Sequence, residues 1–454
     1  MKDEQHRIAD VLVIGGGAAG LMAAGFAAGG GAKTVVLERN ERMARKVMIT
    51  GKGRCNVTNH TDLGGLIAHT VRNPRFLYSA FAAFSSDDTM QLLESLGVPL
   101  KVERGNRVFP VSDRAVDVVD GLVRFASRQG VRCVHGRAQS IRTCGIANGE
   151  TGFAVMTQEG EEQFARAVIL ATGGASYPAT GSTGDGYSIA RELGHTVVKP
   201  EPSLVPVEVK EGFCSQLQGL SLKNVTLTVE DVEKKRTVFQ ELGELMFAHY
   251  GLSGPLALSA SAHMQPMREG RYVLHIDCKP GLTPEQLDAR LTRDLAQNLN
   301  RDFINSLSAL LPKSLIPVAV RLSRVPAGTK CNQVTRAMRQ QFCAVIKDLT
   351  LTAARFRPVE EAVVTAGGVS TREIDPKTMA SKRVEGLYFA GEVIDVDAYT
   401  GGFNLQIAFS TGALAGRSAA CAVRQDGSSG SAQGLTASPA DAMIDTNSGR
   451  KNGI

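Results

Sequence analysis

Residues 10–39 read DVLVIGGGAAGLMAAGFAAGGGAKTVVLER and decide the fold of this chain. The apolar run VLVI predicts a buried strand, the small residues after it predict a helix, and the run TVVL predicts a second strand. Gly15, Gly17 and Gly20 fill the pattern G-x-G-x-x-G. The first glycine permits a tight turn, the second lets a pyrophosphate approach the backbone, and the third lets the helix pack closely on the strand. This order of elements predicts a dinucleotide-binding α/β unit.

Two further features of this unit indicate the same kind of ligand. The helix start offers unpaired N–H groups and the positive end of the helix dipole to phosphates. Glu38 ends the second strand at about the spacing expected for a carboxylate that accepts hydrogen bonds from ribose hydroxyls. The alternative is an apolar N-terminal signal or membrane segment, but the many glycines between residues 15 and 31 argue against it.

Composition sets broad limits on the function. The length of 454 residues suits about three domain-sized units, or one large domain with an insertion. The net charge of +6 permits an anionic ligand without demanding nucleic acid. The 8 cysteines are scattered and form no C-x-x-C, so we expect no metal site and no dithiol redox motif. The polar first ten residues and the lack of a membrane span predict a cytoplasmic protein with reduced thiols.

A basic loop with glycines follows the second strand, where residues 45–56 read RKVMITGKGRCN. Arg and Lys supply charge and the glycines expose N–H groups, so the loop suits a phosphate-rich ligand, although a solvated basic loop is the alternative. No resolving partner is obvious near the thiol, so we expect the cysteine to contact the ligand through its backbone. The candidate ligand-binding residues of this stretch are Arg39, Lys46, Thr50, Gly51, Gly53, Arg54, Cys55 and Asn56.

Two later apolar runs end in small residues. VILATGG at 168–174 leads to TGSTGDG at 180–186, and LYFAGE at 387–392 leads to TGGFNLQIA at 400–408. A parallel strand that ends in small residues brings its backbone to the carboxyl edge of the sheet, where ligands bind in doubly wound folds. For the first run, an ordinary strand-to-helix turn is the alternative. The glycine pair at 401–402 is expected to open a second helix whose N-terminus faces the ligand.

The middle of the chain has a different pattern, which begins after the boundary Pro200-Glu201-Pro202. Short β-like runs are followed by a helix that starts with a threonine cap at Thr283 and carries leucines on one face as far as Leu299. His249 lies in a glycine-flanked turn of this region. It is either an active-site group or a histidine whose ring is hydrogen-bonded by the local backbone. Elsewhere we expect one helix over 76–96.

These motifs together resemble the YhiN/BaiN-type family of FAD-dependent oxidoreductases, which includes aminoacetone-oxidase-like members. The resemblance covers about residues 9 to 417, and its most specific parts are the TGKGRCN loop and the AGE…D…TGGFNLQ segment. The TGDG segment is also similar to fumarate-reductase-type flavoproteins. The resemblance implies an α/β fold in which a two-dinucleotide-type, Rossmann-like FAD domain is assembled from both chain ends, with an inserted β-rich domain and a small helical subdomain.

The resemblance also implies the domain bounds and the cofactor contacts. The expected units are the FAD domain (1–199 and 347–420), the β-rich domain (200–282 and 323–346), the helical subdomain (283–322) and a disordered tail (421–454). Glu38 would bind the adenosine ribose, residues 15–20 the pyrophosphate, and Asp397 the ribityl chain. The other residues assigned to FAD are Ala18, Ala19, Ala138, Thr172, Gly173, Gly174, Asp185, Gly391, Glu392, Gly401, Gly402, Phe403 and Asn404.

The leading expectation is an enzyme that passes a hydride between a small organic substrate and flavin N5, with NADH or NADPH as a candidate donor. Tyr399, Thr400 and His249 are the candidate substrate-facing, catalytic residues. The family resemblance leaves oxidase and reductase open, and the oligomeric state is also open. The alternatives are a flavoprotein acting on RNA and a non-catalytic flavin or NAD sensor. We expect no nucleic-acid partner, because the chain has no aromatic-plus-basic RNA-binding pattern.

Overall fold

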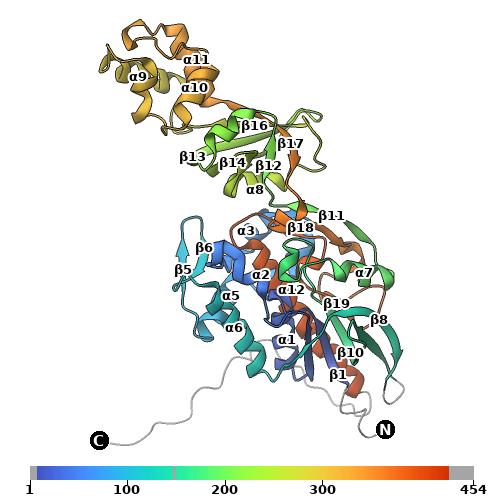
Figure 1. Cartoon of the computed structure of the whole chain (residues 1–454). Helices are drawn as coiled ribbons and strands as arrows, with labels where there is room; N and C mark the ends of the chain where they lie inside the picture. The colour runs from blue at the N-terminus through green and yellow to red at the C-terminus, as the bar shows by residue number, and fades with distance from the viewer. Residues whose placement is uncertain (1–7, 147–149, 429–454) are drawn as a thin grey trace, which may run out of the picture.

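The computed structural model describes residues 8–146 and 150–428 of the chain. They form two bodies stacked end to end and joined by two extended connections (Figure 1). The lower body contains the first and the last described residues, and the upper body is built from the middle of the chain. The connections are the stretches 203–207 and 356–364.

A sheet with a parallel core organises the lower body. In sheet order its strands are β7 (Arg132–His135), β2 (Thr34–Glu38), β1 (Ala9–Ile14), β10 (Glu162–Leu170), β9 (Thr151–Thr157) and β8 (Ala138–Gly145), with β19 (Leu387–Phe389) beside β10. β7, β2, β1, β10 and β19 are parallel, while β9 and β8 extend β10 in the antiparallel sense. The predicted α/β fold is therefore confirmed, including a strand from the far end of the chain.

Two helices from opposite ends of the chain lie side by side against this sheet, α1 (Ala18–Gly29) and α12 (Phe403–Ser428) (Figure 1). A Cβ added at Gly412 would lie 2.4 Å from the Ala19 carbonyl oxygen, and one added at Gly416 would lie 2.2 Å from that of Ala23. The helices therefore approach at backbone distance, which the small residues of both permit.

Shorter elements surround the sheet. They are α2 (Arg45–Ile49), β3 (Thr58–Asn59), α3 (Leu63–Ala68), β4 (Thr70–Arg72), α4 (Tyr78–Ala83), α5 (Ser86–Ser95), β5 (Leu100–Glu103), β6 (Arg107–Pro110), α6 (Ala115–Arg128), α7 (Asp185–Glu192), β11 (Val197–Ser203), β18 (Val364–Val369) and β20 (Asp397–Ala398). The expectation of a single helix over 76–96 was wrong. Ser85 and Asp88 form a capping box, which starts a new helix after Phe84 and splits the stretch in two.

The upper body contains a closed barrel. Its strands are β12 (Val207–Val209), β15 (Gly251–Ser253), β14 (Arg236–Ala248), β13 (Ser221–Asp231), β16 (Tyr272–Asp277) and β17 (Leu349–Phe356), and α8 (Gly254–Ser261) follows β15. The long hairpin of β13 and β14 has register shifts at Lys223/Val225 and Val229/Glu230. Such bulges bend strands and increase their twist, which helps a sheet to close into a barrel.

Three helices, α9 (Pro284–Ala296), α10 (Leu315–Ser323) and α11 (Arg336–Lys347), pack on one another at the end of the barrel (Figure 1). Thr283 and Gln286 form the expected capping box of α9. Leu299 does not share the buried leucine face, because α9 ends at Ala296, and its side chain is exposed. The segment 323–346, which we grouped with the β-rich domain, carries α11 and packs with the helices.

The C-terminal boundary also differs from the expectation. α12 continues to Ser428, so residues 421–428 of the expected tail are helical. The rest of that tail lies outside the described residues. Within the described ranges, none of the helices combines the length and the apolar character needed to cross a bilayer.

Candidate cofactor and substrate site

The glycine turn between β1 and α1 forms an open cradle at a helix N-terminus. A Cβ at Gly20 would lie 1.8 Å from the Gly15 carbonyl oxygen, so only glycine fits there. Gly15 has a φ of +102°, which side-chain-bearing residues rarely adopt. Around Gly17, in contrast, nothing lies within 4 Å of an added Cβ. Gly17 caps α1 without a side-chain hydrogen bond, so the first N–H groups of α1 are free to bind a phosphate.

Glu38 ends β2 and lies buried beside the glycine turn. Its Oε2 accepts a hydrogen bond from the Gly16 amide at 2.6 Å, and its Oε1 accepts from the backbone and side-chain amides of Asn40 at 2.8 and 2.7 Å. The carboxylate that we assigned to a ribose is therefore held in place by the protein. A carboxylate oxygen has two acceptor sites, so Oε2, which accepts one hydrogen bond, can still accept a second from a ribose hydroxyl.

Lys46 joins the basic loop to the far end of the chain. Its Nζ donates to Ser176 Oγ at 2.7 Å and to Glu392 Oε2 at 2.6 Å. The other oxygen of Glu392 accepts from the Thr365 amide at 2.8 Å. The Lys46 ammonium is thus neutralised and half-buried. Both residues were assigned to FAD from the sequence, and the structure brings them together in an ion pair that holds the loop against the end of β19.

The arginines of this region are also paired with carboxylates. Arg54 binds Glu103 and Asp113, with its guanidinium over the Phe109 ring. Arg39 donates to Thr183 at 2.7 Å and to Asp185 at 3.1 Å. The charge that we expected them to offer to the cofactor is therefore balanced within the protein.

Asp185, at the start of α7, also forms an ion pair with a second arginine. Arg137 donates to both of its carboxylate oxygens at 2.7 Å. Burial opposes the ionisation of Asp185, but the hydrogen bonds from Arg137 and Thr183 outweigh it and lower the pKa below its usual value. Ala138 is buried next to Arg137 at the start of β8. The ion pairs thus gather the ends of β2 and β7, the start of β8 and α7, where we expected the adenosine half of FAD.

Cys55 has no redox character in this structure. The residue is completely buried, and burial raises the pKa of its thiol to about 12. Its φ of +60°, together with those of Gly51, Lys52 and Gly53, winds the loop through left-handed conformations. Such a winding turns backbone N–H groups toward one side, as an anion-binding nest does. The expectation that Cys55 acts through its backbone agrees with this geometry.

We predict that the native protein at pH 8 reacts with iodoacetamide at Cys133 and Cys421, which are exposed, but not at Cys55. Only the thiolate attacks, and both burial and the raised pKa suppress it at Cys55. Peptide mass spectrometry after a short pulse would measure this difference, and alkylation in guanidinium chloride would serve as the control for full reactivity. Rapid labelling of Cys55 in the native protein would contradict the buried thiol.

Several buried oxygens of this region have no hydrogen-bond partner within the described chain, and they test the fit to a cofactor. Buried polar groups in proteins are normally hydrogen-bonded, so a bound polar ligand would satisfy them. The ribityl hydroxyls and ring N–H of FAD are groups of that kind. The residues present therefore fit this cofactor. The oxygens are Asn56 Oδ1, Thr172 Oγ1, Asp395 Oδ1 and Asp397 Oδ1.

Asp397 is the most perturbed carboxyl of this set. Burial raises its pKa to about 6, although Ser203 donates to its Oδ2 at 2.6 Å and the Arg72 guanidinium lies 3.4 Å from its Oδ1. Arg72 also lies 3.5 Å from Asp395. One arginine therefore faces two buried carboxyls beside β4 and β20. A ribityl hydroxyl placed against Asp397, as the resemblance implies, would find an acceptor held in a fixed orientation.

The second helix N-terminus is built by Gly401 and Gly402, which precede α12 with φ values of +116° and +99°. A Cβ at Gly402 would lie 2.3 Å from the Thr58 carbonyl carbon, so this turn must pass close to β3. Asn404 then bonds back to the chain before the turn. It accepts from the Ala398 amide at 3.0 Å and donates to the carbonyls of Ala398 and Tyr399 at 2.8 and 3.2 Å. Asn404 thereby fixes the turn that carries Tyr399.

Tyr399 is the centre of a cluster of ionisable side chains from both bodies. Its hydroxyl lies 2.8 Å from His263 Nε2 in the upper body. Burial, followed by the adjacent Glu241 carboxylate of β14, raises the pKa of Tyr399 to about 12. Burial also raises the pKa of Glu241 and lowers that of His263. His69 lies edge-on to the Tyr399 ring at 5.4 Å between centroids. The arrangement can hold the protonated Tyr399 phenol next to Glu241 and His263, two groups able to return a proton to it.

Two further contacts fix the surroundings of Tyr399. His69 stacks on Phe403 with ring centroids 4.6 Å apart and planes 6° from parallel. The Thr400 hydroxyl lies 3.1 Å from that of Ser259 in α8. The candidates Tyr399 and Thr400 therefore both face the upper body, where the two bodies meet.

The third candidate, His249, lies elsewhere in the barrel. It is exposed in the turn between β14 and β15, with its ring against Tyr250. Sequence reasoning missed His69, Glu241 and His263, because nothing local marks them: each becomes notable only through its contact with Tyr399. The buried Gln406, which bonds Thr58, Thr89 and Phe84, was also missed.

A family model described as the HI0933-like protein Rossmann domain matches residues 9–418. The chain belongs to this family. It is a FAD-dependent oxidoreductase, as the sequence motifs predicted.

Curated relatives match almost the whole chain. The HI0933-like chain is 32% identical to a 3-dehydro-bile acid delta(4,6)-reductase of Clostridium scindens, over 90% of this chain and 98% of the relative. It is 31% identical to a ribosomal RNA dihydrouridine synthase of Escherichia coli, over 88% of this chain and 96% of the relative. Among solved structures, a 3-ketosteroid-delta4-(5alpha)-dehydrogenase of Rhodococcus jostii is 17% identical with a TM-score of 0.49, covering 91% of this chain and 96% of that one.

Proposed function

We propose that this HI0933-like protein reduces a carbon–carbon double bond conjugated to a carbonyl group. The two curated relatives have nearly equal identity to the chain but different named reactions. Both names describe the same chemistry, because a 4,6-diene beside a 3-ketone and the 5,6-bond of uracil are each conjugated to a carbonyl. The shared chemistry is therefore the part that carries over to this chain.

Such a reduction adds a hydride to a carbon remote from the carbonyl and a proton to a carbon nearer to it. When bound, FAD supplies the two-electron hydride chemistry. The protein must then orient the acceptor and deliver the proton. Saturation of the double bond thus consumes one hydride from the donor and one proton from a side chain, and the side chain recovers its proton from water.

The observation that carries the proposal is the cluster around Tyr399. Its hydroxyl is protonated at neutral pH, and burial and Glu241 raise its pKa further, to about 12. A weak acid held next to a substrate is suited to protonating a developing enolate. His263 lies 2.8 Å from that hydroxyl and can return a proton to it. We assign Tyr399 as the general acid and His263 as the group that reprotonates it.

The backbone around Tyr399 holds the side chain in place. The Tyr399 amide donates to the His69 carbonyl at 3.0 Å, and Asn404 binds the Tyr399 carbonyl. The turn is thus tied to α3 and α12 at once. Catalytic groups need this kind of support, since small misplacements cost much of the rate.

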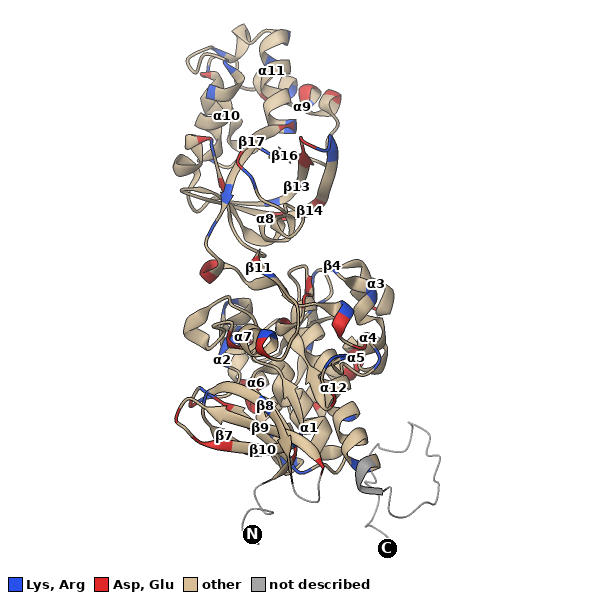
Figure 2. Ribbon diagram, turned by 90° about the vertical axis from the view of Figure 1, so that its right-hand side faces the viewer, with Lys and Arg blue, Asp and Glu red and all other residues tan. Residues whose placement is uncertain are grey.

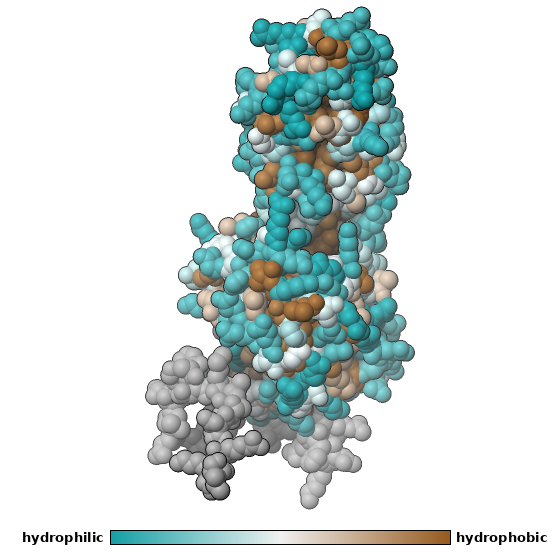
Figure 3. All heavy atoms as spheres, turned by 90° about the vertical axis from the view of Figure 1, so that its left-hand side faces the viewer, coloured by the Kyte–Doolittle hydropathy of each residue, from teal (hydrophilic) through white to brown (hydrophobic). Residues whose placement is uncertain are grey.

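The first candidate substrate is a small conjugated carbonyl compound with an apolar skeleton. On the face drawn in Figure 3, hydrophobic residues gather on the upper body down to its junction with the lower one. The second candidate is a uridine in RNA, which the name of the second relative favours. In the ribbon of Figure 2, basic and acidic residues are interspersed along both bodies. We therefore place the small substrate first.

The test is the oxidative half-reaction. We expect the anaerobically reduced holoenzyme to be reoxidised rapidly by a steroid 4,6-dien-3-one acid, with a product 2 Da heavier than the acceptor. A uridine-containing ribosomal RNA fragment would be the parallel acceptor, and faster reoxidation by it would favour the second candidate. Reoxidation by neither, combined with reduction of the oxidised flavin by simple amines, would overturn the proposal in favour of an oxidase.

A further inference from the structure

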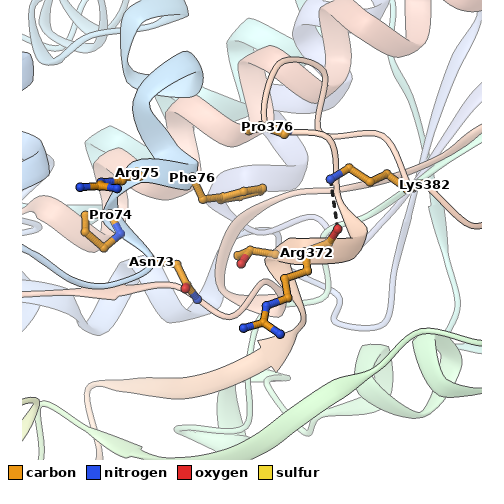
Figure 4. A pocket seen from close by; sticks show the side chains of 8 residues that line it. Asn73, Pro74, Arg75, Phe76, Arg372, Pro376 and Lys382 are labelled. Carbon is orange, nitrogen blue, oxygen red and sulfur yellow. Dashed lines mark hydrogen bonds between the residues drawn. The ribbon is translucent and has the colours of Figure 1, made fainter.

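A second site lies in the lower body, in a pocket of about 510 Å³ (Figure 4). Two segments that are far apart in the sequence form its walls: the turn that follows β4, and the loop between β18 and β19. A volume of this size suits a nucleotide-sized ligand. The lining residues are Asn73, Pro74, Arg75, Phe76, Thr371, Arg372, Pro376 and Lys382.

The pocket is lined by three cations and no carboxylate. Within the described part of the chain, the guanidinium groups of Arg75 and Arg372 have no hydrogen bond and no ion pair, and both side chains are exposed. The Lys382 ammonium donates to the Arg372 carbonyl at 3.0 Å and keeps further donors (Figure 4). Arg39, Arg54 and Arg137 of the cofactor region are paired with carboxylates, whereas among the described residues these cations are not.

One acidic residue of the same loop, Glu373, is committed elsewhere. Glu373 accepts from the amide and hydroxyl of Thr196 at 2.8 Å and pairs with Arg383. Although burial opposes it, these partners hold the pKa of Glu373 at about 2, so the carboxylate stays ionised and engaged. Ser381 further bonds the buried His195 at 2.9 Å. The loop is therefore fastened next to β11 through Glu373 and Ser381, while Arg372 and Lys382 line the pocket.

One wall of the pocket is hydrogen-bonded to the region expected to hold the cofactor. Asn73 on its wall donates to the Asp395 carbonyl at 2.7 Å and to the Asp395 carboxylate at 3.1 Å. β4, which ends just before Asn73, pairs with β20, which leads directly to Tyr399. A ligand held by the pocket is thus close to the residues expected to hold the ribityl chain.

We propose that this pocket binds the phosphate groups of a reduced nicotinamide dinucleotide, which gives its hydride to FAD. This inference rests on the proposed function, which requires a donor. The chain has one dinucleotide fingerprint, at 15–20, and that fingerprint is assigned to FAD, so a nicotinamide must bind outside a Rossmann turn. Three unpaired cations suit a ligand with several negative charges. In the step, the donor loses one hydride to oxidised FAD and leaves as the oxidised nicotinamide.

The test is stopped-flow reduction of the holoenzyme by NADPH and by NADH. We expect Arg75→Ala and Arg372→Ala each to raise the apparent Kd of the donor about 10-fold, since a charge-assisted hydrogen bond to phosphate is lost. The limiting rate constant of reduction should change less than about 2-fold. ADP-ribose, as a dead-end probe, should bind the oxidised holoenzyme more weakly by a similar factor. Arg372→Lys should restore part of the loss.

Lys377→Ala is the matched control, because Lys377 is exposed on the same loop but does not line the pocket. An unchanged Kd in both arginine variants, or a flavin that neither nicotinamide reduces, would overturn the assignment. Weaker binding of a ribosomal RNA fragment, with the nicotinamide Kd unchanged, would overturn it in favour of an RNA phosphate. If a nicotinamide reduced the flavin normally but no conjugated acceptor reoxidised it, the result would count only against the proposed function.

Discussion

Replacing Tyr399 with phenylalanine is expected to slow reoxidation of the reduced flavin by a conjugated acceptor about 10²- to 10⁴-fold, the usual contribution of a general acid. The substitution removes one hydroxyl and keeps the ring, which packs against His69 and His263. FAD content and the rate of flavin reduction by the donor should stay within about 2-fold of the wild type, because proton delivery to the acceptor belongs to the second half-reaction alone.

His249→Ala is the control for this experiment, since both residues were candidates from the sequence. His249 is exposed, and its ring lies edge-on to the neighbouring Tyr250 ring. We expect less than about a 2-fold effect on either half-reaction. A large loss in His249→Ala with normal kinetics in Tyr399→Phe would reverse the two roles. Equal losses in both half-reactions of Tyr399→Phe would show that the residue supports the structure and does not deliver a proton.

The predictable part of this site is the part that local sequence determines. Gly15 and Gly20 are fixed by a turn that no other residue can adopt. The strands β1, β10 and β19 are apolar runs that end in small residues, and β2 is an apolar run that ends in Glu38. These features follow from backbone geometry and burial, which act over short stretches of chain. The Rossmann part of the fold could therefore be read from the sequence, while its assembly from both chain ends was implied by the family resemblance.

The substrate side could not be read in the same way. Tyr399, Glu241 and His263 come from separate elements, and their chemistry arises only when the barrel meets the lower body. The ion pair of Lys46 with Glu392 joins residues 346 positions apart. The long strand β14 was also hidden, because its bulged pairing with β13 interrupts the two-residue alternation on which strand prediction depends.

The second large effect is expected from a pair of glycines in the same turn. Gly20→Ala should destabilise the protein even without FAD, because the new Cβ would lie 1.8 Å from the Gly15 carbonyl oxygen. Overpacking of this kind costs about 1–3 kcal/mol or more, so we expect a clearly lower Tm of the FAD-free protein and little retained flavin. Thermal unfolding followed by circular dichroism, together with the flavin absorbance of the purified protein, measures both effects.

Gly17→Ala separates cofactor binding from folding. No protein atom lies within 4 Å of the added Cβ, and Gly17 has a φ of −79°, which alanine adopts freely. The Tm of the FAD-free protein should therefore stay close to that of the wild type, because the restriction of the unfolded chain by alanine offsets its weaker N-capping of α1. The affinity for FAD should fall at least about 10-fold, since the methyl group enters the space in which the pyrophosphate meets the start of α1.

Gly212→Ala controls for the substitution itself, because its Cβ also meets open space, and it lies in the upper body away from the turn. If Gly17→Ala bound FAD as tightly as the wild type, the open space above α1 would be ordinary solvent, and the pyrophosphate would have to bind elsewhere. If it lost stability without FAD, the turn would be more crowded than its geometry indicates. Only normal folding combined with weak FAD binding places the cofactor against the N-terminus of α1.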